Sequence, residues 1–480
     1  MTANGLPEEG GDPTQFNDDL APIDKRNRPW GWFEIFNVWT NCTQSLFGYT
    51  LAASLFISYG LNGWAVFAGI ILAGFLIMIF VNLAGRPSVK YGVPFPVIVR
   101  ASMGVRGANL PAMIRGVVAI FWYGAQTYIA STAISLLIHS LIEVDSTGTF
   151  LSLTAVDWIS FGIVWSFQLF LFWKGMEWIR NYLNWAGPAV YVVMIALMVV
   201  LWVEAGNSLL SELGIIFHGT GSYSGGPFAA FMAVVGTMVS YYAAVILNFG
   251  DLSRFVRGER AMRLGNFIGL PFNIAFFSFI ALFVTAGTVV VFGQQLTNPT
   301  EIVGRVGSLP LTIISALTFF GATVGINLIA NFVPPAYDLS NLMPSRISFR
   351  RGGLIAAGIS FFVGALWVSI VSTLGIFGFV NTLGALLAPA YGILVADYYV
   401  VRRRQLDIAM LFSTDPKGPC YYWRGWNVRA LATFSLVAIF SVLAVWWPPL
   451  SPLSGLDWII GAALAALIYV ALMKGRRMRL

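Results

Sequence analysis

Ionisable side chains are scarce in this chain of 480 residues, since only 10% are Asp, Glu, Lys or Arg and two are His. Soluble domains carry about 25% charged residues, so this composition excludes an assembly of water-soluble domains. The first 29 residues are polar and lack an apolar core. We therefore expect no signal peptide here, and we expect residues 1–29 to be a cytosolic tail. With 58% hydrophobic residues, the rest indicates a polytopic membrane protein.

Cysteines and paired catalytic groups are also scarce. The two cysteines, Cys42 and Cys420, form no CxxC motif and indicate neither a disulfide framework nor a zinc site. No nucleophile–base cluster, metal constellation or phosphate loop is present, so we expect neither an enzyme nor a cofactor. No carboxylate is expected at mid-membrane, where a proton relay would usually carry one. The carboxylates nearest the apolar segments fall at their predicted ends or in loops: Glu34, Glu177, Asp251, Asp338 and Asp397.

Long apolar segments dominate what is present. A bilayer core of about 30 Å needs about 20 apolar residues per helix. Twelve segments meet this requirement and predict an all-α fold of twelve transmembrane helices. They lie near 33–58, 64–84, 108–138, 156–174, 185–205, 228–249, 266–292, 306–332, 353–371, 374–400, 428–447 and 457–473.

The positive charges test this topology. With the N-terminus inside, 27 of the 28 Lys and Arg residues fall in cytoplasmic segments, and only Arg305 falls outside. Such a bias is typical of membrane proteins with both termini in the cytoplasm. It explains the net charge of +7 without nucleic acid. We expect a multi-pass protein of the plasma membrane (the inner membrane in a bacterium), with the lipid bilayer as partner and its oligomeric state open.

Two of the predicted spans carry polar interruptions. Span 33–58 has six consecutive polar or small residues from Thr40 to Ser45, and span 228–249 contains Gly236 and Thr237. Irregular backbone within a membrane is tolerated where it lines a cavity. Broken helices at equivalent places in two halves indicate a transporter with inverted repeats and a midplane site.

The interrupted spans are the first and the sixth, so the predicted repeats contain five helices each. The first repeat would cover residues 30–205 and the second 206–400. Residues 401–480 would form a cytosolic loop and two peripheral helices. This five-plus-five arrangement rests on hydropathy and on the paired interruptions.

Aromatic and amide side chains share a face in the third span. Trp122 and Gln126 are four residues apart, hence on one side of a helix. This pair suits a flat heterocycle, which would stack on the indole and bond to the amide. Tyr241 and Tyr242 in the sixth span are candidates for the opposite aromatic face. Interhelical packing is the alternative explanation for each of these residues.

The eighth span carries two amides. Asn327 and Asn331 are four residues apart and share a face. An amide facing lipid would be unsatisfied, so both must face a cavity or another helix. Either substrate recognition or an interhelical hydrogen bond explains them. The Pro334–Pro335 pair predicts that this helix ends just after Asn331.

Four stretches in order resemble the nucleobase:cation symporter-1 family. They are GRPSVKYGVPFPVIVRASMGVRGANLPAMIRGVVAIFWYGAQTY (85–128), NFGDLSRF (248–255), PPAYDLSNLMP (334–344) and ADYYVVRRRQL (396–406). The likeness extends from about Trp30 to about Trp426. Members import purines, pyrimidines, hydantoins, allantoin and related ring amides with sodium or protons. The resemblance also implies the five-plus-five inverted repeat.

Site residues follow from this resemblance position by position. The family's stacking Trp and neighbouring Gln match Trp122 and Gln126. Its sixth-helix aromatic, commonly Trp, aligns with Tyr242. Its substrate-binding Asn matches Asn331, with Asn327 one turn earlier, and a polar contact position of the first helix aligns with Ser45.

The resemblance is weakest at the cation site. Its first-helix carbonyls would fall on Asn41 and Gln44, and its eighth-helix carbonyl on Ala322. The family's Ser-Thr hydroxyl pair reads Gly325–Ile326, which has no side-chain oxygen. Sodium favours oxygen ligands, so the change favours protons, or a mechanism that is insensitive to sodium, over sodium coupling. Thr43 and Thr323 are the nearest substitute hydroxyls.

The expected function is secondary active import of a nucleobase or related cyclic amide, such as uracil, cytosine, a purine, a hydantoin or allantoin. The ring would stack between Trp122 and Tyr242, while Gln126 and Asn331 would bind its amide edge. A transporter of the same fold for an amino acid or another zwitterion is one alternative, and a passive channel or a receptor is another.

Overall fold

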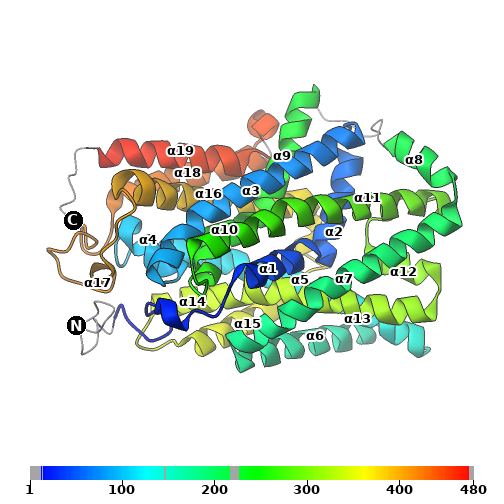
Figure 1. The fold of residues 1–480 in the computed structure, drawn as a ribbon, viewed down its shortest axis with the longest axis horizontal. Helices are drawn as coiled ribbons and strands as arrows, with labels where there is room; N and C mark the ends of the chain where they lie inside the picture. Colours follow the sequence, from blue (N-terminus) through cyan, green and yellow to red (C-terminus); the bar gives the residue numbers. More distant parts are fainter. Residues whose placement is uncertain (1–11, 13, 145–147, 217–225, 454, 475–480) are drawn as a thin grey trace.

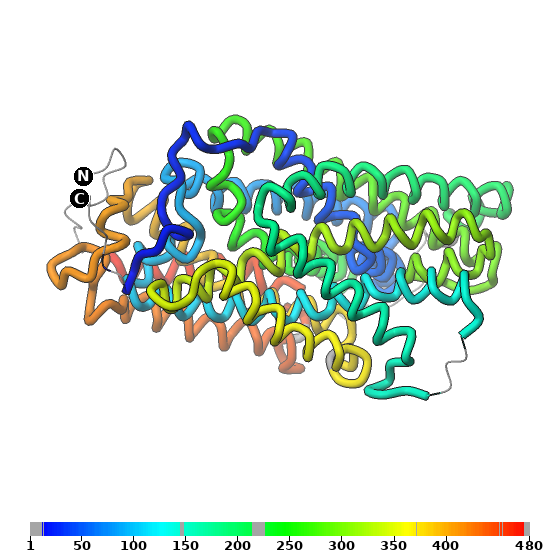
Figure 2. The backbone as a smooth tube through the Cα atoms, turned by 90° about the horizontal axis from the view of Figure 1, so that it is seen from below, coloured from blue at the N-terminus to red at the C-terminus, as the bar shows by residue number. Residues whose placement is uncertain are grey.

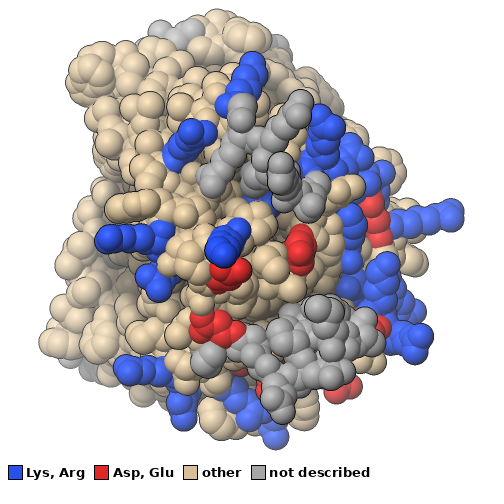
Figure 3. Space-filling view, turned by 90° about the vertical axis from the view of Figure 1, so that its left-hand side faces the viewer, with Lys and Arg blue, Asp and Glu red and all other residues tan. Residues whose placement is uncertain are grey.

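The computed structural model describes residues 12, 14–144, 148–216, 226–453 and 455–474. Its long helices run roughly along one common axis and form an elongated bundle (Figure 1, Figure 2). Lys and Arg side chains gather on the face at one end of that axis, where α4 and α17 lie (Figure 1, Figure 3). We call this face the basic end.

The elements of the first half follow the predicted spans. In chain order they are η1 Lys25–Asn27, α1 Trp32–Thr43, α2 Leu46–Ser58, α3 Gly63–Tyr91, α4 Phe95–Met103, α5 Asn109–Leu141, the strands β1 Thr149–Phe150 and β2 Leu153–Thr154, α6 Ala155–Lys174, α7 Met176–Ala205 and α8 Ser208–Ile216. The two strands form a short antiparallel pair.

The second half is also helical. Its elements are α9 Gly226–Ser253, α10 Glu259–Phe267, η2 Ile268–Phe272, α11 Asn273–Phe292, α12 Pro299–Val306, α13 Leu309–Ile326, η3 Asn327–Phe332, α14 Val333–Leu342, α15 Phe349–Ala365, η4 Val371–Leu374, α16 Ile376–Ala396, η5 Asp397–Val401, α17 Ile408–Leu411, α18 Val428–Trp446, η6 Pro448–Leu453 and α19 Asp457–Met473.

The expected polytopic membrane architecture is confirmed. Within the described ranges, nine helices are long and apolar enough to cross a membrane, and α2 and α19 are shorter apolar helices. Each of the twelve predicted spans overlaps a helix. The count of twelve crossings and the division into two inverted repeats remain predictions.

The predicted break in the first span is confirmed. α1 ends at Thr43 and α2 begins at Leu46. Ser45 has extended backbone and caps α2, because its Oγ accepts a hydrogen bond from the Gly48 N–H at 2.9 Å. Short polar side chains offer such alternatives to the helical hydrogen bonds, which explains why the polar run interrupts the helix here.

The predicted break in the sixth span is wrong, because α9 is one continuous helix from Gly226 to Ser253. Its polar residues serve contacts between helices. The Thr237 hydroxyl lies 3.2 Å from the Tyr59 hydroxyl of the segment after α2. A Cβ on Gly236 would lie 1.4 Å from the Gly455 carbonyl oxygen, so this glycine allows close backbone packing. Polar and small residues therefore indicated packing here, and not an interruption.

The eighth span continues through the prolines, contrary to the prediction that it ends there. α13 passes through the π-helical segment η3 into α14, which starts at Val333 and ends at Leu342. Pro334 and Pro335 lie in the first turn of α14. The Val333 N–H just before them bonds to the Leu328 carbonyl in the wider register of η3. A local π-helical adjustment of this kind lets a membrane helix continue through proline.

The N-terminal segment, residues 14–30, packs across the basic end and does not extend freely as a tail. Arg254, just after α9, donates hydrogen bonds to the carbonyls of Asp19, at 2.8 Å, and Ala21. The Asn17 amide donates to Ser340 of α14 at 2.7 Å. The Asp19 carboxylate accepts the N–H of the first residue of α15 at 2.8 Å. The segment thus joins α9, α14 and α15.

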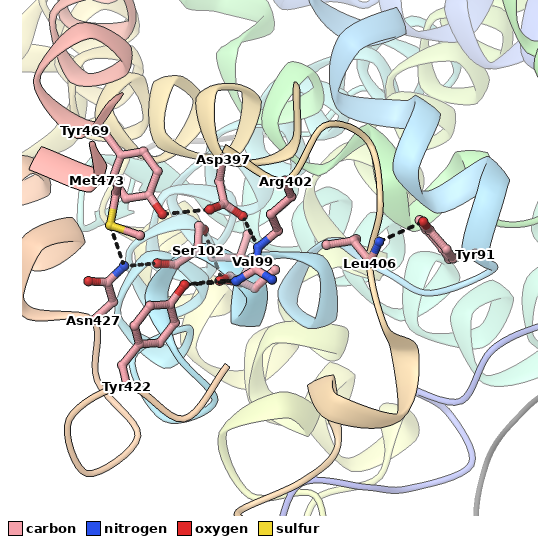
Figure 4. A network of polar contacts seen from close by, with 11 residues as sticks. Tyr91, Val99, Ser102, Asp397, Arg402, Leu406, Tyr422, Asn427, Tyr469 and Met473 are labelled. Atoms are coloured by element: carbon pink, nitrogen blue, oxygen red, sulfur yellow. Dashed lines mark hydrogen bonds and ion pairs between the residues drawn. The ribbon is translucent and has the colours of Figure 1, made fainter. Parts of the chain in front are cut away.

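A second polar network fastens the chain that follows α16 to the basic end (Figure 4). Asp397 of η5 pairs with Arg402 at 2.8 Å and accepts a hydrogen bond from Tyr469 of α19 at 2.7 Å. Arg402 and Tyr422 both donate to the carbonyl of Ala101 in α4. The predicted cytosolic loop is therefore held against the helices by buried groups.

Candidate functional site

Trp122 of α5 is the centre of an aromatic cluster near the break between α1 and α2. It is 4% exposed. Phe47 of α2 and Phe379 of α16 each approach it edge-on, with ring centroids 4.9 Å away. Tyr241 of α9 does so at 5.5 Å. Three other helices thus place rings around the predicted stacking residue, and packing closes the cluster in this conformation.

Tyr241, and not Tyr242, is the tyrosine of α9 beside Trp122. Its hydroxyl lies 3.0 Å from the Oγ of Ser45, so α9 and the break in the first span meet here. The ring of Tyr242 lies 6.4 Å from that of Trp39 in α1. Consecutive helical residues point about 100° apart, so only one of the two can face α5. The arrangement therefore differs from the expected Trp122–Tyr242 sandwich.

The two asparagines of η3 form a short hydrogen-bonded chain. The Asn331 amide donates to the Oδ1 of Asn327 at 3.0 Å. The Asn327 amide in turn faces the Tyr123 carbonyl at 3.1 Å and the Thr127 hydroxyl at 3.0 Å, both in α5. It also donates to the Gln168 side chain of α6 at 3.0 Å. Asn327 thus links η3 to α5 and α6. It also positions Asn331, which is the last residue of this series of hydrogen bonds.

Gln126 has unused hydrogen-bonding capacity next to this chain. It is 1% exposed, and its Oε1 has no hydrogen-bond partner among the described residues. Buried polar atoms are nearly always paired, so an unpaired one at a closed aromatic site is expected to bind a ligand or water. Sequence reasoning missed Thr127 and Gln168; an amide in the apolar span 156–174 was the available signal for Gln168.

At the expected cation position, the side chain of Asn41 packs against Gly325. The Asn41 amide of α1 donates to the carbonyls of Asn37, at 2.8 Å, and Leu183, at 3.0 Å. A Cβ on Gly325 would lie 2.3 Å from the Asn41 Oδ1. The side chain of Asn41 therefore occupies space that a larger residue at position 325 would need.

Only some of the other residues at the expected cation position carry a side-chain oxygen that is free to bind an ion. Ile326 and Ala322 are buried and apolar. The Thr323 hydroxyl accepts the Leu46 N–H at 3.3 Å, so it caps α2. The Asn41 Oδ1 and both amide atoms of Gln44 are buried, and none has a hydrogen-bond partner within the described part of the chain.

A charged cluster lies between the aromatic site and the basic end. Arg115 of α5 and Asp338 of α14 form an ion pair at 3.0 Å, and both side chains are 0% exposed. Arg115 precedes Trp122 by seven residues, and Asp338 follows Asn331 by seven. Seven residues are about two helical turns, or roughly 10 Å. The two helices that carry the candidate site therefore also carry this pair.

Asp251 of α9 adds a second carboxylate to the cluster. It is fully buried, and its Oδ1 accepts the Phe95 N–H at 2.8 Å. No ion pair holds Asp251 among the described residues, although the charge of Arg115 acts on it. Four polar atoms of the cluster lack hydrogen-bond partners in the described structure: Arg115 Nε and Nη2, Asp338 Oδ1 and Asp251 Oδ2.

The expectation that these carboxylates lie near span ends holds for Asp338, which is about one turn before α14 ends at Leu342. Because α14 extends beyond the prolines, Asp338 is part of a buried helix and not of a loop. Asp251 is within two residues of the end of α9, but it is buried as deeply. The signal that sequence reasoning missed was the arginine seven residues before Trp122, on the same face of α5.

Comparison with known proteins identifies close likenesses over almost the whole chain. Residues 22–461 match a family described as permeases for cytosine/purines, uracil, thiamine and allantoin. An allantoin permease of Bacillus subtilis (strain 168) is 33% identical, over 95% of this chain and 93% of the relative. A hydantoin permease of Microbacterium maritypicum is 27% identical, over 95% of this chain and 88% of the relative.

A solved structure has the same fold. It is that of Mhp1, a nucleobase-cation-symport-1 family transporter in a closed conformation with bromovinylhydantoin bound. The two chains are 23% identical with a TM-score of 0.79, and the match covers 95% of each.

Proposed function

Because this chain belongs to the family of permeases for cytosine/purines, uracil, thiamine and allantoin, the nucleobase:cation symporter-1 family, we propose that it imports a nucleobase or related cyclic amide by alternating access. The basic end faces the cytoplasm in this proposal, since membrane proteins concentrate Lys and Arg on that side. The cell membrane, the inner one in a bacterium, is the proposed location.

The observation that supports this proposal is that aromatic and amide side chains lie together near Trp122. Tyr241 and Phe47 border the indole, and Gln126 lies one turn after Trp122 on the same helix. Asn331 bonds to Asn327, whose amide contacts the carbonyl of Tyr123, the residue next to Trp122. Ring contacts contribute about 0.5–1.5 kcal/mol each beyond area, and an unmatched buried amide costs about 1–3 kcal/mol. These side chains carry no charge, which fits a neutral ring better than an amino acid.

Uptake by intact cells tests this assignment. We expect Trp122→Ala and Asn331→Ala each to reduce uptake of radiolabelled uracil, allantoin or hydantoin at least tenfold, a loss of about 1.4 kcal/mol or more in transition-state stabilisation. Trp202→Ala and Asn181→Ala are matched controls, because both residues are exposed on α7. Full uptake by both site variants, at equal amounts in the membrane, would contradict the proposed site.

Protons are the proposed coupling ion. The supporting feature is the pair of buried carboxylates around one guanidinium, because Arg115 pairs with Asp338 and leaves Asp251 without an ion pair in the described structure. A buried unpaired carboxylate is costly, and protonation removes that cost. The absence of side-chain oxygen at Gly325 and Ile326 points the same way.

Sodium coupling is a second candidate, favoured by the unpaired amide oxygens of Asn41 and Gln44. Uptake with sodium replaced by choline, and then with a protonophore, separates the two ions. Proton coupling predicts that the protonophore abolishes accumulation and that choline does not. It also predicts that Asp251→Asn retains exchange of preloaded substrate but loses accumulation. Strong sodium dependence that disappears in Asn41→Ala would instead establish the sodium site.

A further inference from the structure

A cavity of about 280 Å³ lies above the aromatic cluster, on the side away from the basic end. Its lining comes from α2, α5, the segment before α12 and the segment between α15 and α16. Six of its residues matter here: Phe47, Tyr128, Thr132, Asn298, Trp367 and Ser372. A volume of this size is at the lower limit of small-molecule pockets and suits one small heterocycle.

The floor of the cavity is aromatic. Phe47 is shared with the cluster described above, where its ring meets Trp122 at 4.9 Å. Trp367 meets Phe47 at 6.5 Å and Phe379 at 5.1 Å, each edge-on. A single layer of rings, to which Phe47 belongs, therefore separates the cavity from Trp122. A ring in the cavity would rest on that layer.

The wall of the cavity offers hydrogen bonds. Asn298 uses its Oδ1 to accept from the N–H and hydroxyl of Thr300, at 3.1 and 2.7 Å. Its Nδ2 group has no hydrogen bond to a described residue, and neither does the Tyr128 hydroxyl. An amide donor and a phenol above an aromatic floor complement a planar ring with carbonyl and N–H edges.

We infer that this cavity is a second, outer binding site for the transported ring, occupied before the ring passes the aromatic layer to reach Trp122. The inference rests on the proposed function, which supplies the ligand class. It predicts that a ring in the outer cavity binds to Trp367 and Tyr128. Asn331 does not line this cavity, so binding there should not depend on Asn331.

Thiol protection tests the outer site separately from the inner one. Ser372→Cys places a thiol on the exposed lining in nearly isosteric form, and the two native cysteines are buried, so background labelling is low. The rate of labelling by a membrane-impermeant maleimide is measured on intact cells with and without allantoin, in otherwise native protein and in Asn331→Ala. We expect allantoin to slow labelling about threefold or more in both.

Further variants decide the outcome. Trp367→Ala is expected to abolish protection and Tyr128→Phe to weaken it, whereas Trp202→Ala retains it. An unchanged labelling rate without allantoin shows that a variant is folded at the surface, because unfolding would also expose the two buried native cysteines. Protection that disappears in Asn331→Ala, or persists in Trp367→Ala, would overturn the inference. Uptake of allantoin without protection would also overturn it and leave the proposed function intact. If allantoin, uracil and hydantoin neither enter the cells nor protect the thiol, the proposed function itself fails.

Discussion

Removing the Asn327 side chain should loosen the site without removing a group that contacts the ring. Asn327 shares two amide hydrogens among three acceptors and accepts one hydrogen bond from Asn331. In Asn327→Ala, the Thr127 hydroxyl keeps its 2.7 Å bond to the Tyr123 carbonyl. The Asn331 amide and the Gln168 oxygen lose their best partners. At about 1–3 kcal/mol for each orphaned group, the cost is about 2–6 kcal/mol.

Two measurements check this prediction. Thermal unfolding of the purified protein should show a marked fall in Tm, because both orphaned groups remain buried. The KM for uptake should rise about tenfold, because Asn331 loses its brace. Asn181→Ala removes an exposed amide from α7 and should change neither quantity. A variant Asn327→Ala with unchanged Tm and KM would refute the reasoning that this residue organises the site.

Three further predictions follow from contacts of buried residues. Arg115→Leu alone should lower the free energy of unfolding by about 3–5 kcal/mol, because Asp338 remains charged and buried. The double variant with Leu at positions 115 and 338 should largely restore Tm. Equal Tm values for the single and double variants would contradict this. Gly236→Ala should prevent folding, measured as loss of monodisperse protein in size-exclusion chromatography, because its methyl group would overlap a carbonyl oxygen; a normal yield would refute the close packing. Tyr241→Phe should raise the KM for uptake more than Tyr242→Phe does, because only the first hydroxyl bonds at the break in the first span; the reverse order would contradict the assignment.

Much of the fold follows from hydrophobicity and charge alone. Every predicted span overlaps a helix, and the polar run ending at Ser45 correctly indicated a break. Periodicity placed Asn327 and Asn331 together, and they are hydrogen-bonded. These features depend on local composition, which a single sequence contains.

The errors share a physical origin in contacts between distant segments. Gly236 and Thr237 looked like a break because their partners, the Gly455 carbonyl and the Tyr59 hydroxyl, lie on other segments. Whether Tyr241 or Tyr242 faces Trp122 depends on the rotation of α9, which composition leaves open.

The contacts of the N-terminal segment span most of the chain: Asn17 bonds to Ser340, and Asp19 to the first residue of α15, 323 and 330 positions away. Because contacts this distant must wait for both partners, the segment cannot take its place until α15 has been synthesised. The first described residues to leave the ribosome are thus among the last to fold. The basic end therefore stays open while the first fourteen α-helices are inserted, and α16 to α19 are made only after the segment's partner in α15.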